Sequence, residues 1–415
     1  MSTPTRRDFV LGSAAVALAT AIPSNVFAAS ASKIKVGVVG CGGRGRSAAL
    51  DACTADPDVE IVAMGDMWAD RVGEAMKTLT DRVPKQVNVP RDRQFSGWKA
   101  YEQVIATDCD YVILATPPAF RPMHLEAAIK AKKHVFMEKP IAVDAPGVRS
   151  VLASSETAKA NKLSIVAGTQ RRHELAYRET MKRIHDGQMG EVVACYAYWN
   201  QGGLWQVTRT PQMSDMEWQL RNWLYFTWLS GDHIVEQHIH NLDVCNWAMR
   251  SFPVKAVSLA GRQVRTDAAY GHIFDHFATE YEYESGAKML SMCRQIDGTS
   301  SRVAEHLVGT KGSSNANTWI KGENTWRWEG ERPNPYVLEH KALIDSIRGG
   351  KAINDGESVA KSTLTAIMGR MAGYSGQEVT WDDALKSDVS LMPSKLEFGK
   401  LEVPPVAVPG KTQAL

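Results

Sequence analysis

The chain lacks a hydrophobic run long enough to cross a membrane. Its main apolar run extends from Val10 to Ile22, whereas a membrane-spanning helix needs about 20 consecutive apolar residues. A strong charge of either sign is also missing, because 48 basic and 46 acidic residues give a formal net charge of +2. Without a basic field to attract phosphates, nucleic acid is not an expected partner. We therefore expect a protein body that does not insert into a membrane.

Paired cysteines are absent as well. The six cysteines are scattered and include no Cys-x-x-Cys pair, which argues against a disulfide scaffold or a structural zinc site. No internal repeat or low-complexity tract stands out. Because 415 residues exceed the usual size of one hydrophobic core, the length predicts two domains.

The first residues have the pattern of an export signal. Arg6-Arg7-Asp8-Phe9 precedes the apolar run, and Val26-Phe27-Ala28 follows a polar break. The Val-x-Ala ending fits cleavage after Ala28, and the paired arginines favour the twin-arginine route. We predict a signal peptide over residues 1–28 and a periplasmic mature protein. An uncleaved membrane anchor is the alternative.

From residue 33 the chain alternates β-branched runs with helix-like stretches, which is typical of βαβ units. The expected strands are Ile34 to Val39, Val59 to Met64, Tyr111 to Ala115, His134 to Met137 and Leu163 to Ala167. We predict a doubly wound parallel sheet, a Rossmann domain over residues 29–165.

The pattern changes after Arg171, where a second α/β domain is expected over residues 166–390, followed by a tail over residues 391–415. Several later runs read as antiparallel strands of an open sheet, with a tight turn at Ser285-Gly286. Two helices are expected near Val337 to Arg348 and Glu357 to Tyr374. The fold class is therefore α/β, with a parallel N-terminal sheet and a largely antiparallel C-terminal one.

A glycine-rich turn follows the first strand. A dinucleotide site needs such a turn, because backbone N–H groups at the start of a helix must approach the pyrophosphate. Asp66 ends the second strand at the distance expected for an acid that binds the adenosine ribose. Its charge would repel a 2′-phosphate, which favours NAD over NADP, although Arg71 lies close by in the sequence. In the alternative interpretation Asp66 only caps the next helix. The turn consists of Gly40, Cys41, Gly42, Gly43, Arg44 and Gly45.

Thr116-Pro117-Pro118 follows the strand that begins at Tyr111. Ligands of open α/β sheets bind at the carboxyl ends of the strands, so Thr116 and Pro117 are candidates for the nicotinamide side of the site. A proline-stiffened turn without a binding role is the alternative.

Glu138-Lys139-Pro140 comes directly after the next strand. With the glycine turn, Asp66 and the Thr116-Pro117 turn, this tripeptide makes the chain resemble the glucose–fructose oxidoreductase/inositol dehydrogenase/MocA (Gfo/Idh/MocA) family. The resemblance covers most of the mature chain. It implies an NAD-dependent enzyme for a sugar or polyol, with Glu138 and Lys139 at the cofactor, Lys139 beside the substrate hydroxyl, and a homo-oligomer formed through the C-terminal sheet.

The segment from Ser230 to Asp243 is the second half of the expected site. On one helix, spacings of three and four would place Asp232, Glu236, His240 and Asp243 along one face. The resemblance implies that His240 is the proton-transfer partner of Lys139, that Glu236 orients the substrate and that Asp243 holds the imidazole.

This segment departs from the family pattern, because Glu236 stands where aspartate is usual and Ser230 and Asp232 replace glycines. Its histidines, His233, His238 and His240, leave a metal site open as an alternative. They would point in different directions on a helix, however, so no metal is expected. A buried histidine without a catalytic role is the other alternative.

Further substrate candidates carry less weight. Arg171 and Arg172 precede a helix-like segment, and His276 lies on a predicted strand. Trp205 belongs to a tryptophan-rich stretch between residues 199 and 247 that could form a carbohydrate platform or, equally, a packed core or subunit contact.

The leading hypothesis is hydride transfer between NAD and a sugar, glycoside or polyol hydroxyl. A second enzyme class keeps NAD tightly bound and uses transient oxidation to cleave a glycosidic bond by elimination. A third class is a sugar-binding protein that retains only the fold. Because the periplasm offers no NAD pool, we expect a captive cofactor in either enzyme.

Overall fold

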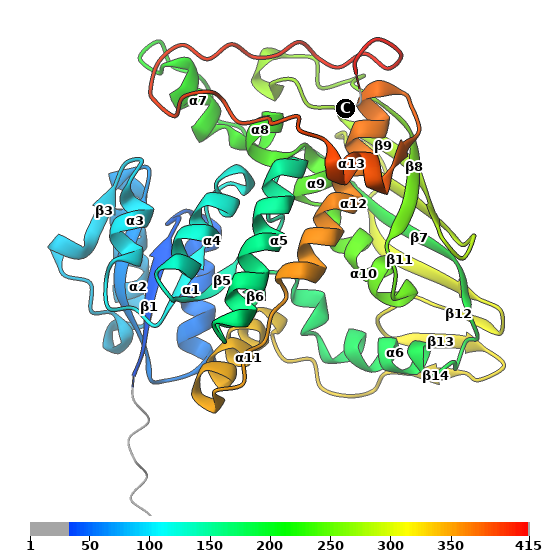
Figure 1. Cartoon of the computed structure of the whole chain (residues 1–415), viewed down its shortest axis with the longest axis horizontal. Helices are drawn as coiled ribbons and strands as arrows, with labels where there is room; N and C mark the ends of the chain where they lie inside the picture. The colour runs from blue at the N-terminus through cyan, green and yellow to red at the C-terminus, as the bar shows by residue number, and fades with distance from the viewer. Residues whose placement is uncertain (1–32, 414–415) are drawn as a thin grey trace, which may run out of the picture. The chain divides into compact units, whose positions relative to one another are not determined.

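The computed structural model describes residues 33–413, so the signal predicted over residues 1–28 lies outside the described residues. In Figure 1 the parallel sheet with its helices and the larger C-terminal sheet are seen as separate layers. No helix within residues 33–413 combines the length and the apolar character needed to span a membrane.

The N-terminal sheet confirms the Rossmann prediction. Its six strands are parallel, in the order β3-β2-β1-β4-β5-β6, which is the doubly wound arrangement that binds dinucleotides. The strands are β1 (Ile34–Val39), β2 (Val59–Asp66), β3 (Gln94–Ser96), β4 (Tyr111–Leu114), β5 (His134–Met137) and β6 (Ile165–Ala167). The helices are α1 (Gly43–Ala55), α2 (Ala69–Arg82), α3 (Ala100–Ile105), α4 (Arg121–Lys130) and α5 (Ala145–Ala160). The predicted domain boundary at residue 165 falls within β6.

The C-terminal sheet has nine strands in the order β14-β13-β12-β11-β7-β10-β9-β8-β15. Only β7 and β10 pair in parallel, so the predicted, largely antiparallel sheet is confirmed. Gly286, with a φ of 81°, turns the chain between β9 and β10 as expected. The strands are β7 (Val192–Gln201), β8 (Pro253–Gly261), β9 (His276–Tyr283), β10 (Lys288–Gln295), β11 (Arg302–Gly309), β12 (Gly312–Ser314), β13 (Trp319–Gly322), β14 (Trp326–Arg327) and β15 (Val379–Thr380).

The expected single helix over residues 230–243 is wrong. The chain forms α8 (Thr227–Ser230), α9 (His233–Glu236) and α10 (Ile239–Met249) instead. Gly231 and Asp232 both have a positive φ, 77° and 74°, which a right-handed helix does not allow. The break turns Asp232 away from the face that it was expected to share with His240.

Two late helices return to the body, as predicted. They are α11 (Pro335–Gly349) and α12 (Gly356–Ser375), while α6 (Leu175–His185), α7 (Asp215–Arg221) and α13 (Trp381–Lys386) complete the longer helices. Leu343 and Ile344 of α11 belong to the buried cluster around β1 and β2. Asn354 forms a parallel bridge to Ile165 of β6. The Rossmann half is therefore completed by residues far along the chain.

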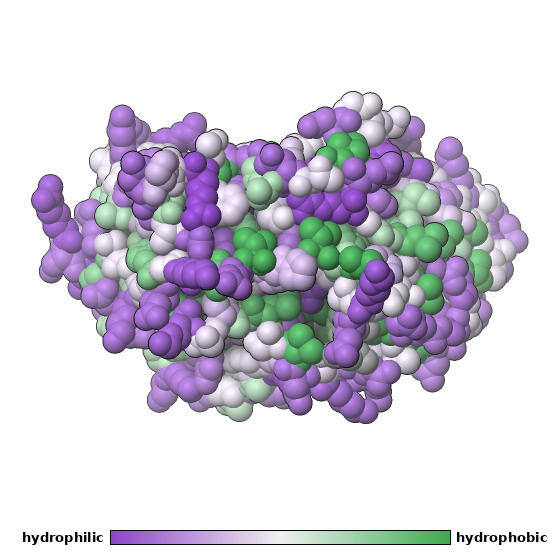
Figure 2. All heavy atoms as spheres, turned by 90° about the horizontal axis from the view of Figure 1, so that it is seen from above, coloured by the Kyte–Doolittle hydropathy of each residue, from purple (hydrophilic) through white to green (hydrophobic). Residues whose placement is uncertain are grey.

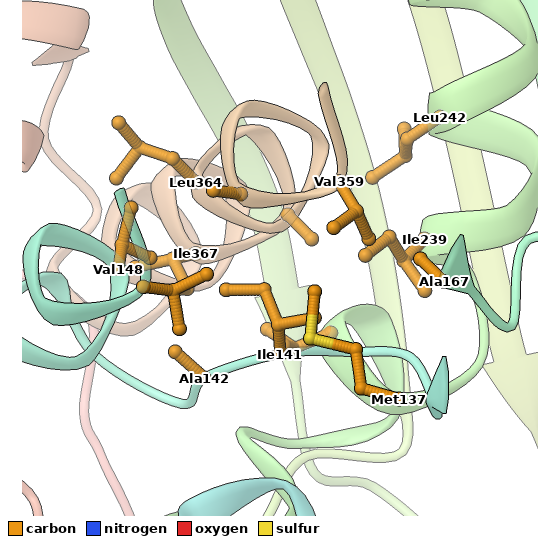
Figure 3. Close-up of a cluster of buried hydrophobic side chains, with 14 of the residues drawn as sticks. Met137, Ile141, Ala142, Val148, Ala167, Ile239, Leu242, Val359, Leu364 and Ile367 are labelled. Atoms are coloured by element: carbon orange, nitrogen blue, oxygen red, sulfur yellow. The ribbon is translucent and has the colours of Figure 1, made fainter. Parts of the chain in front are cut away.

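A buried cluster joins the two halves next to the candidate site (Figure 3). Met137 and Ile141 flank the Glu138-Lys139-Pro140 turn, and Ile239 and Leu242 flank His240; all four side chains are fully buried. Val359, Leu364 and Ile367 of α12 pack in the same cluster. Since apolar packing fixes both backbone segments, Lys139 is held against the segment that carries Glu236 and His240.

Candidate active site

The glycine turn between β1 and α1 has the shape that a pyrophosphate requires. A Cβ atom on Gly45 would lie 1.7 Å from the carbonyl oxygen of Gly40, so only glycine fits there. A Cβ on Gly42 or Gly43 would meet no atom within 4 Å, which leaves open space above the turn. Gly42 is the N-cap of α1 and no side chain caps that end. The first N–H groups of α1 are thus available to a bound phosphate.

Asp66 lies at the end of β2, beside this turn. Its Oδ2 accepts a hydrogen bond from Cys41 N at 2.6 Å, and its Oδ1 accepts one from Trp68 N at 3.0 Å. Burial raises the pKa of Asp66, while these two N–H donors act in the opposite direction. The N-cap of α2 is Trp68 and not Asp66. This arrangement favours a ribose-binding role for Asp66 over the helix-cap alternative.

A cavity of about 830 Å³ extends from the glycine turn toward the C-terminal half. Most predicted cofactor residues line it, together with the predicted substrate residue Trp205. Gly45, Glu138 and Lys139 do not line it, and neither do Glu236 and His240. The predicted cofactor residues in the lining are Gly40, Gly42, Gly43, Arg44, Asp66, Thr116 and Pro117.

The Thr116-Pro117 turn forms part of the cavity wall at the carboxyl end of β4. Thr116 Oγ1 lies 3.2 Å from Nδ1 of His124 on α4. Burial lowers the pKa of His124 to about 3, so this ring is uncharged at neutral pH. The turn thus offers an uncharged wall beside the glycine turn.

Glu138 and Lys139 lie at the end of β5 and make different contacts. The carboxylate of Glu138 is ion-paired with Arg44 of the glycine turn. Lys139 Nζ donates to the backbone oxygen of Glu236 at 2.6 Å and lies 3.3 Å from its Oε1. Both side chains of the second pair are largely buried, with 12% exposure for Lys139 and 14% for Glu236. The turn therefore connects the cofactor site to the C-terminal half.

His240 is buried and stacks on Trp199 of β7, with ring centroids 5.6 Å apart. Burial lowers the pKa of His240 well below its ordinary value, and the positive charges of Lys139 and Arg171 add to this effect. The ring is therefore neutral at physiological pH and can accept a proton. Lys139, whose charge acts on this imidazole, contacts Glu236, four residues before His240.

Asp243 has other partners than the imidazole that it was expected to hold. Its two carboxylate oxygens accept from Arg172 Nε and Nη2, both at 2.8 Å, and Ser362 Oγ donates to Oδ1 at 2.7 Å. Asp243 is 2% exposed. The expectation for both residues is thereby corrected: Arg172 and Asp243 form a buried ion pair that ties α10 to α12 and to the segment before α6.

Of the remaining charged candidates, Arg171 lies near His240, whereas His276 lies on the opposite face of the sheet. Arg171 lies close enough to influence the pKa of His240, but its guanidinium is paired with Glu305 at 2.7 Å. His276 shares the sheet face of Ala278, which pairs with the highly exposed Leu259 of β8. This face is opposite to the one that α10 and α12 cover, so His276 does not belong to the Lys139–His240 group.

The histidines of the segment do not converge. His233 Nδ1 lies 2.8 Å from Asp232, and His238 Nε2 lies 2.7 Å from Ser291 Oγ. Asp232 also accepts from Tyr374 Oη at 2.6 Å, which makes it part of a buried network. Among residues 33–413, no three His, Cys, Asp or Glu side chains are grouped as a metal site.

The tryptophan-rich stretch divides between two roles. Trp205 and Trp223 line the cavity, with ring centroids 6.2 Å apart. Trp218 and Trp228 are buried in a separate hydrophobic cluster. Core packing therefore applies to Trp218 and Trp228, whereas a carbohydrate platform at Trp205 stays a prediction.

Several site residues had no motif to mark them. Trp68 and Trp98 line the cavity near Asp66. From α11, Tyr336 lies under the guanidinium of Arg44 at 4.7 Å. Burial raises the pKa of Glu339 well above its usual range, and the nearby charge of Glu138 adds to this rise. The only signal for Trp68 was its position two residues after Asp66, whereas α11 comes from a distant part of the chain.

Comparison with known proteins supports the dinucleotide site. Residues 34–166 match the model of the GFO_IDH_MocA family, described as "Oxidoreductase family, NAD-binding Rossmann fold". The matched residues contain the glycine turn, Asp66 and Glu138-Lys139-Pro140. The chain is an NAD-dependent oxidoreductase. Its N-terminal part, residues 34–166, is similar to the NAD-binding domain of that family.

Relatives and solved structures extend this likeness beyond the matched domain. An inositol 2-dehydrogenase 3 from Saccharopolyspora erythraea is 24% identical over 77% of this chain and 86% of its own length. A glycosyl hydrolase family 109 protein from Streptomyces coelicolor is 29% identical over 38% of this chain and 32% of its own. The structure of scyllo-inositol dehydrogenase from Lactobacillus casei with NAD(H) and scyllo-inositol has a TM-score of 0.64 at 20% identity, covering 84% of this chain and 99% of that one. The structural likeness shows a shared fold.

Proposed function

We propose that this oxidoreductase transfers a hydride between NAD and a CH–OH group of a sugar, glycoside or polyol. One observation carries the proposal: Lys139, at the carboxyl end of β5, contacts Glu236, and its charge helps to keep buried His240, four residues farther along the chain, neutral. An ammonium and a neutral imidazole are the groups that an alcohol oxidation needs, because the hydroxyl must lose a proton as its carbon loses a hydride. The names of the inositol dehydrogenase relatives support the substrate class.

Each of these residues has a distinct role in the proposed reaction. Bound NAD supplies the hydride acceptor. Lys139 donates a hydrogen bond to the substrate oxygen, and Glu236 fixes the position of the Lys139 ammonium. His240, neutral because it is buried, accepts the proton that leaves the hydroxyl. The stacked Trp199 ring holds the imidazole in place.

Redox-assisted glycoside cleavage is the second candidate. In that reaction a transiently oxidised sugar hydroxyl acidifies the neighbouring C–H bond, so a further base is needed for elimination. The carboxylate of Glu236, 3.3 Å from Lys139 Nζ, could serve as that base. Similarity to glycosyl hydrolase family 109 proteins also supports this candidate.

The experiment that tests the proposal uses the purified chain with NAD and a panel of inositols, aldoses and aryl glycosides. NADH formation and aglycone release are followed in parallel. NADH that accumulates with substrate supports net oxidation, whereas aglycone release without net NADH supports the second candidate. The same panel identifies which sugar or polyol is used.

The decisive variant is Lys139→Ala. We expect its turnover to fall about 10²- to 10⁴-fold, the usual range for loss of an acid/base group, with NAD binding retained. Lys130→Ala is the matched control, because Lys130 is exposed and forms an ion pair with Glu126 within α4. Full activity of the Lys139→Ala variant would refute the acid/base role proposed for Lys139. Sugar binding by the wild-type chain without turnover of any compound in the panel would exclude both enzyme candidates and favour a sugar-binding protein.

We also propose that the mature protein is periplasmic and forms a homo-oligomer. The paired arginines Arg6 and Arg7 support export, and an Arg6→Lys/Arg7→Lys chain should stay in the cytoplasm. The open face of the nine-stranded sheet supports oligomer formation, because Val257, Leu259 and Met292 expose apolar side chains there.

A further inference from the structure

The segment after α13 returns to the cofactor side of the molecule. Figure 1 shows this tail leaving α13, reaching α7 and then running back toward α13. Leu391 N donates to Asp144 Oδ2 at 2.8 Å. Farther along, Leu401 N donates to Asp215 Oδ2 at 3.1 Å, and Gln219 Nε2 donates to the oxygen of Leu401 at 2.8 Å. Both ends of residues 391–401 are thus fixed to the body.

Between these anchors the tail contacts the wall of the NAD cavity. Phe398 stacks on Trp68, with ring centroids 5.5 Å apart and planes 28° apart, and contacts Trp98 at 5.6 Å. Trp68, Trp98 and Leu396 all line the cavity that also contains Asp66. The guanidinium of Arg221 from α7 lies over Trp68 at 3.8 Å. Aromatic rings and a cation from three parts of the chain therefore surround one end of the cavity.

We propose that residues 391–401 complete the adenosine subsite of the NAD cavity and retain the cofactor there. Asp66 marks this end of the cavity as the ribose side, and Trp68 lies two residues beyond it. A flat adenine ring binds well between aromatic faces. The matched family residues end at 166, so the tail lies outside the matched NAD-binding domain. This inference rests on NAD binding and not on the identity of the substrate.

The exposure of Phe398 is that of a segment packed on the outside of the cavity wall and not that of a strand in the buried core. Phe398 keeps 49% of its surface exposed although its ring contacts two tryptophans. Seen from the side of the tail, hydrophobic side chains form separate clusters among hydrophilic ones (Figure 2). Removal of one half-exposed ring should therefore leave the fold intact. Phe398 acts through Trp68 and Trp98, because it contacts both rings without lining the cavity itself.

The test is the release rate of NAD from the full chain, followed by tryptophan fluorescence in excess ADP-ribose. Loss of the two Phe398 contacts in Phe398→Ala should speed NAD release roughly tenfold. ADP-ribose binding should weaken to a similar degree, whereas nicotinamide mononucleotide, which lacks adenosine, should bind unchanged. Lys395→Ala is the control, because that side chain lies in the same segment and is 77% exposed.

Phe398→Leu, which keeps an apolar side chain without the ring, separates stacking from general packing. It should release NAD faster than the wild-type chain while unfolding at the same denaturant concentration. An NAD release rate that is unchanged in both Phe398 variants would overturn the proposal. Equal weakening of ADP-ribose and nicotinamide mononucleotide would overturn it too, since the tail would then act on the whole fold.

Discussion

Replacement of Asp243 by alanine distinguishes a structural role from a catalytic one. The variant would leave the Arg172 guanidinium without its two 2.8 Å acceptors in a site where Asp243 is almost fully buried. Removal of one partner of a buried ion pair typically costs about 3–5 kcal/mol of unfolding free energy. Ser362 also loses its acceptor, so the upper part of this range is expected.

The corresponding change in melting temperature follows from the size of the protein. With about 2.1 cal/mol/K of unfolding entropy per residue, roughly 380 folded residues give about 0.8 kcal/mol/K, so the melting temperature should fall by about 5–6 °C. Calorimetry and urea unfolding measure this change. Asp186→Ala is the control, because Asp186 forms only an exposed pair with Lys182, worth less than about 1 kcal/mol.

The kinetic result decides between the two roles. Since Asp243 contacts Arg172 and Ser362, we expect the turnover of the folded Asp243→Ala variant to stay near that of the wild-type enzyme below its melting temperature. A double variant, Arg172→Leu/Asp243→Leu, should regain part of the lost stability, because no unpaired charge remains. Wild-type stability of Asp243→Ala together with a large loss of turnover would refute the reasoning and restore Asp243 as the partner of His240.

Two further predictions concern stability at low pH and the proposed subunit contact. Burial lowers the pKa of His340 to about 3. Its contribution to the unfolding free energy is therefore present above the unfolded pKa and is lost as the pH falls, because the unfolded ring takes up a proton that the buried ring does not. The loss is about 2 kcal/mol between pH 7 and 5. In His340→Phe, the difference in unfolding free energy between pH 7 and pH 5, measured by urea unfolding, should be smaller by this amount. A difference equal to that of the wild-type chain would contradict the prediction. Leu259 is 79% exposed on the open sheet face. Leu259→Lys places a charge within the proposed contact, so light scattering should detect monomers. Intact oligomers would exclude this face as the contact.

The sequence predicted the parts of the fold whose signals are local. All buried strands of the Rossmann sheet except short β3 were expected, because β-branched runs and a glycine turn mark them. Strand β7 lies between β10 and β11, and its partners come much later in the chain, so no local pattern indicated its place. The helix over residues 230–243 was expected from spacing alone. The buried contacts of Asp232 with Phe274 N and Tyr374 stabilise the positive φ that breaks it.

In the candidate site as well, the sequence indicated residues that a local pattern marks and missed contacts between residues far apart in the chain. The glycine turn, Asp66 and Lys139 follow predicted strands, and the structure places each at the carboxyl end of its strand. The partners of Asp243 and Arg171 could not be predicted, because an ion pair depends on which helices pack together. Phe398 and Trp68 are separated by most of the chain, and only the folded tail brings them into contact.

The shared core beside the active site has a consequence for how the molecule moves. Leu114 of β4 and Met137 of β5 belong to the same continuous cluster as Met289 of β10 and Leu307 of β11. Separating the halves as rigid bodies would expose this apolar interior to water, at a cost that grows with the area uncovered. A hinge motion is therefore an expensive way to admit small molecules. Exchange should depend on peripheral segments, while heat or urea should melt both halves in one cooperative transition.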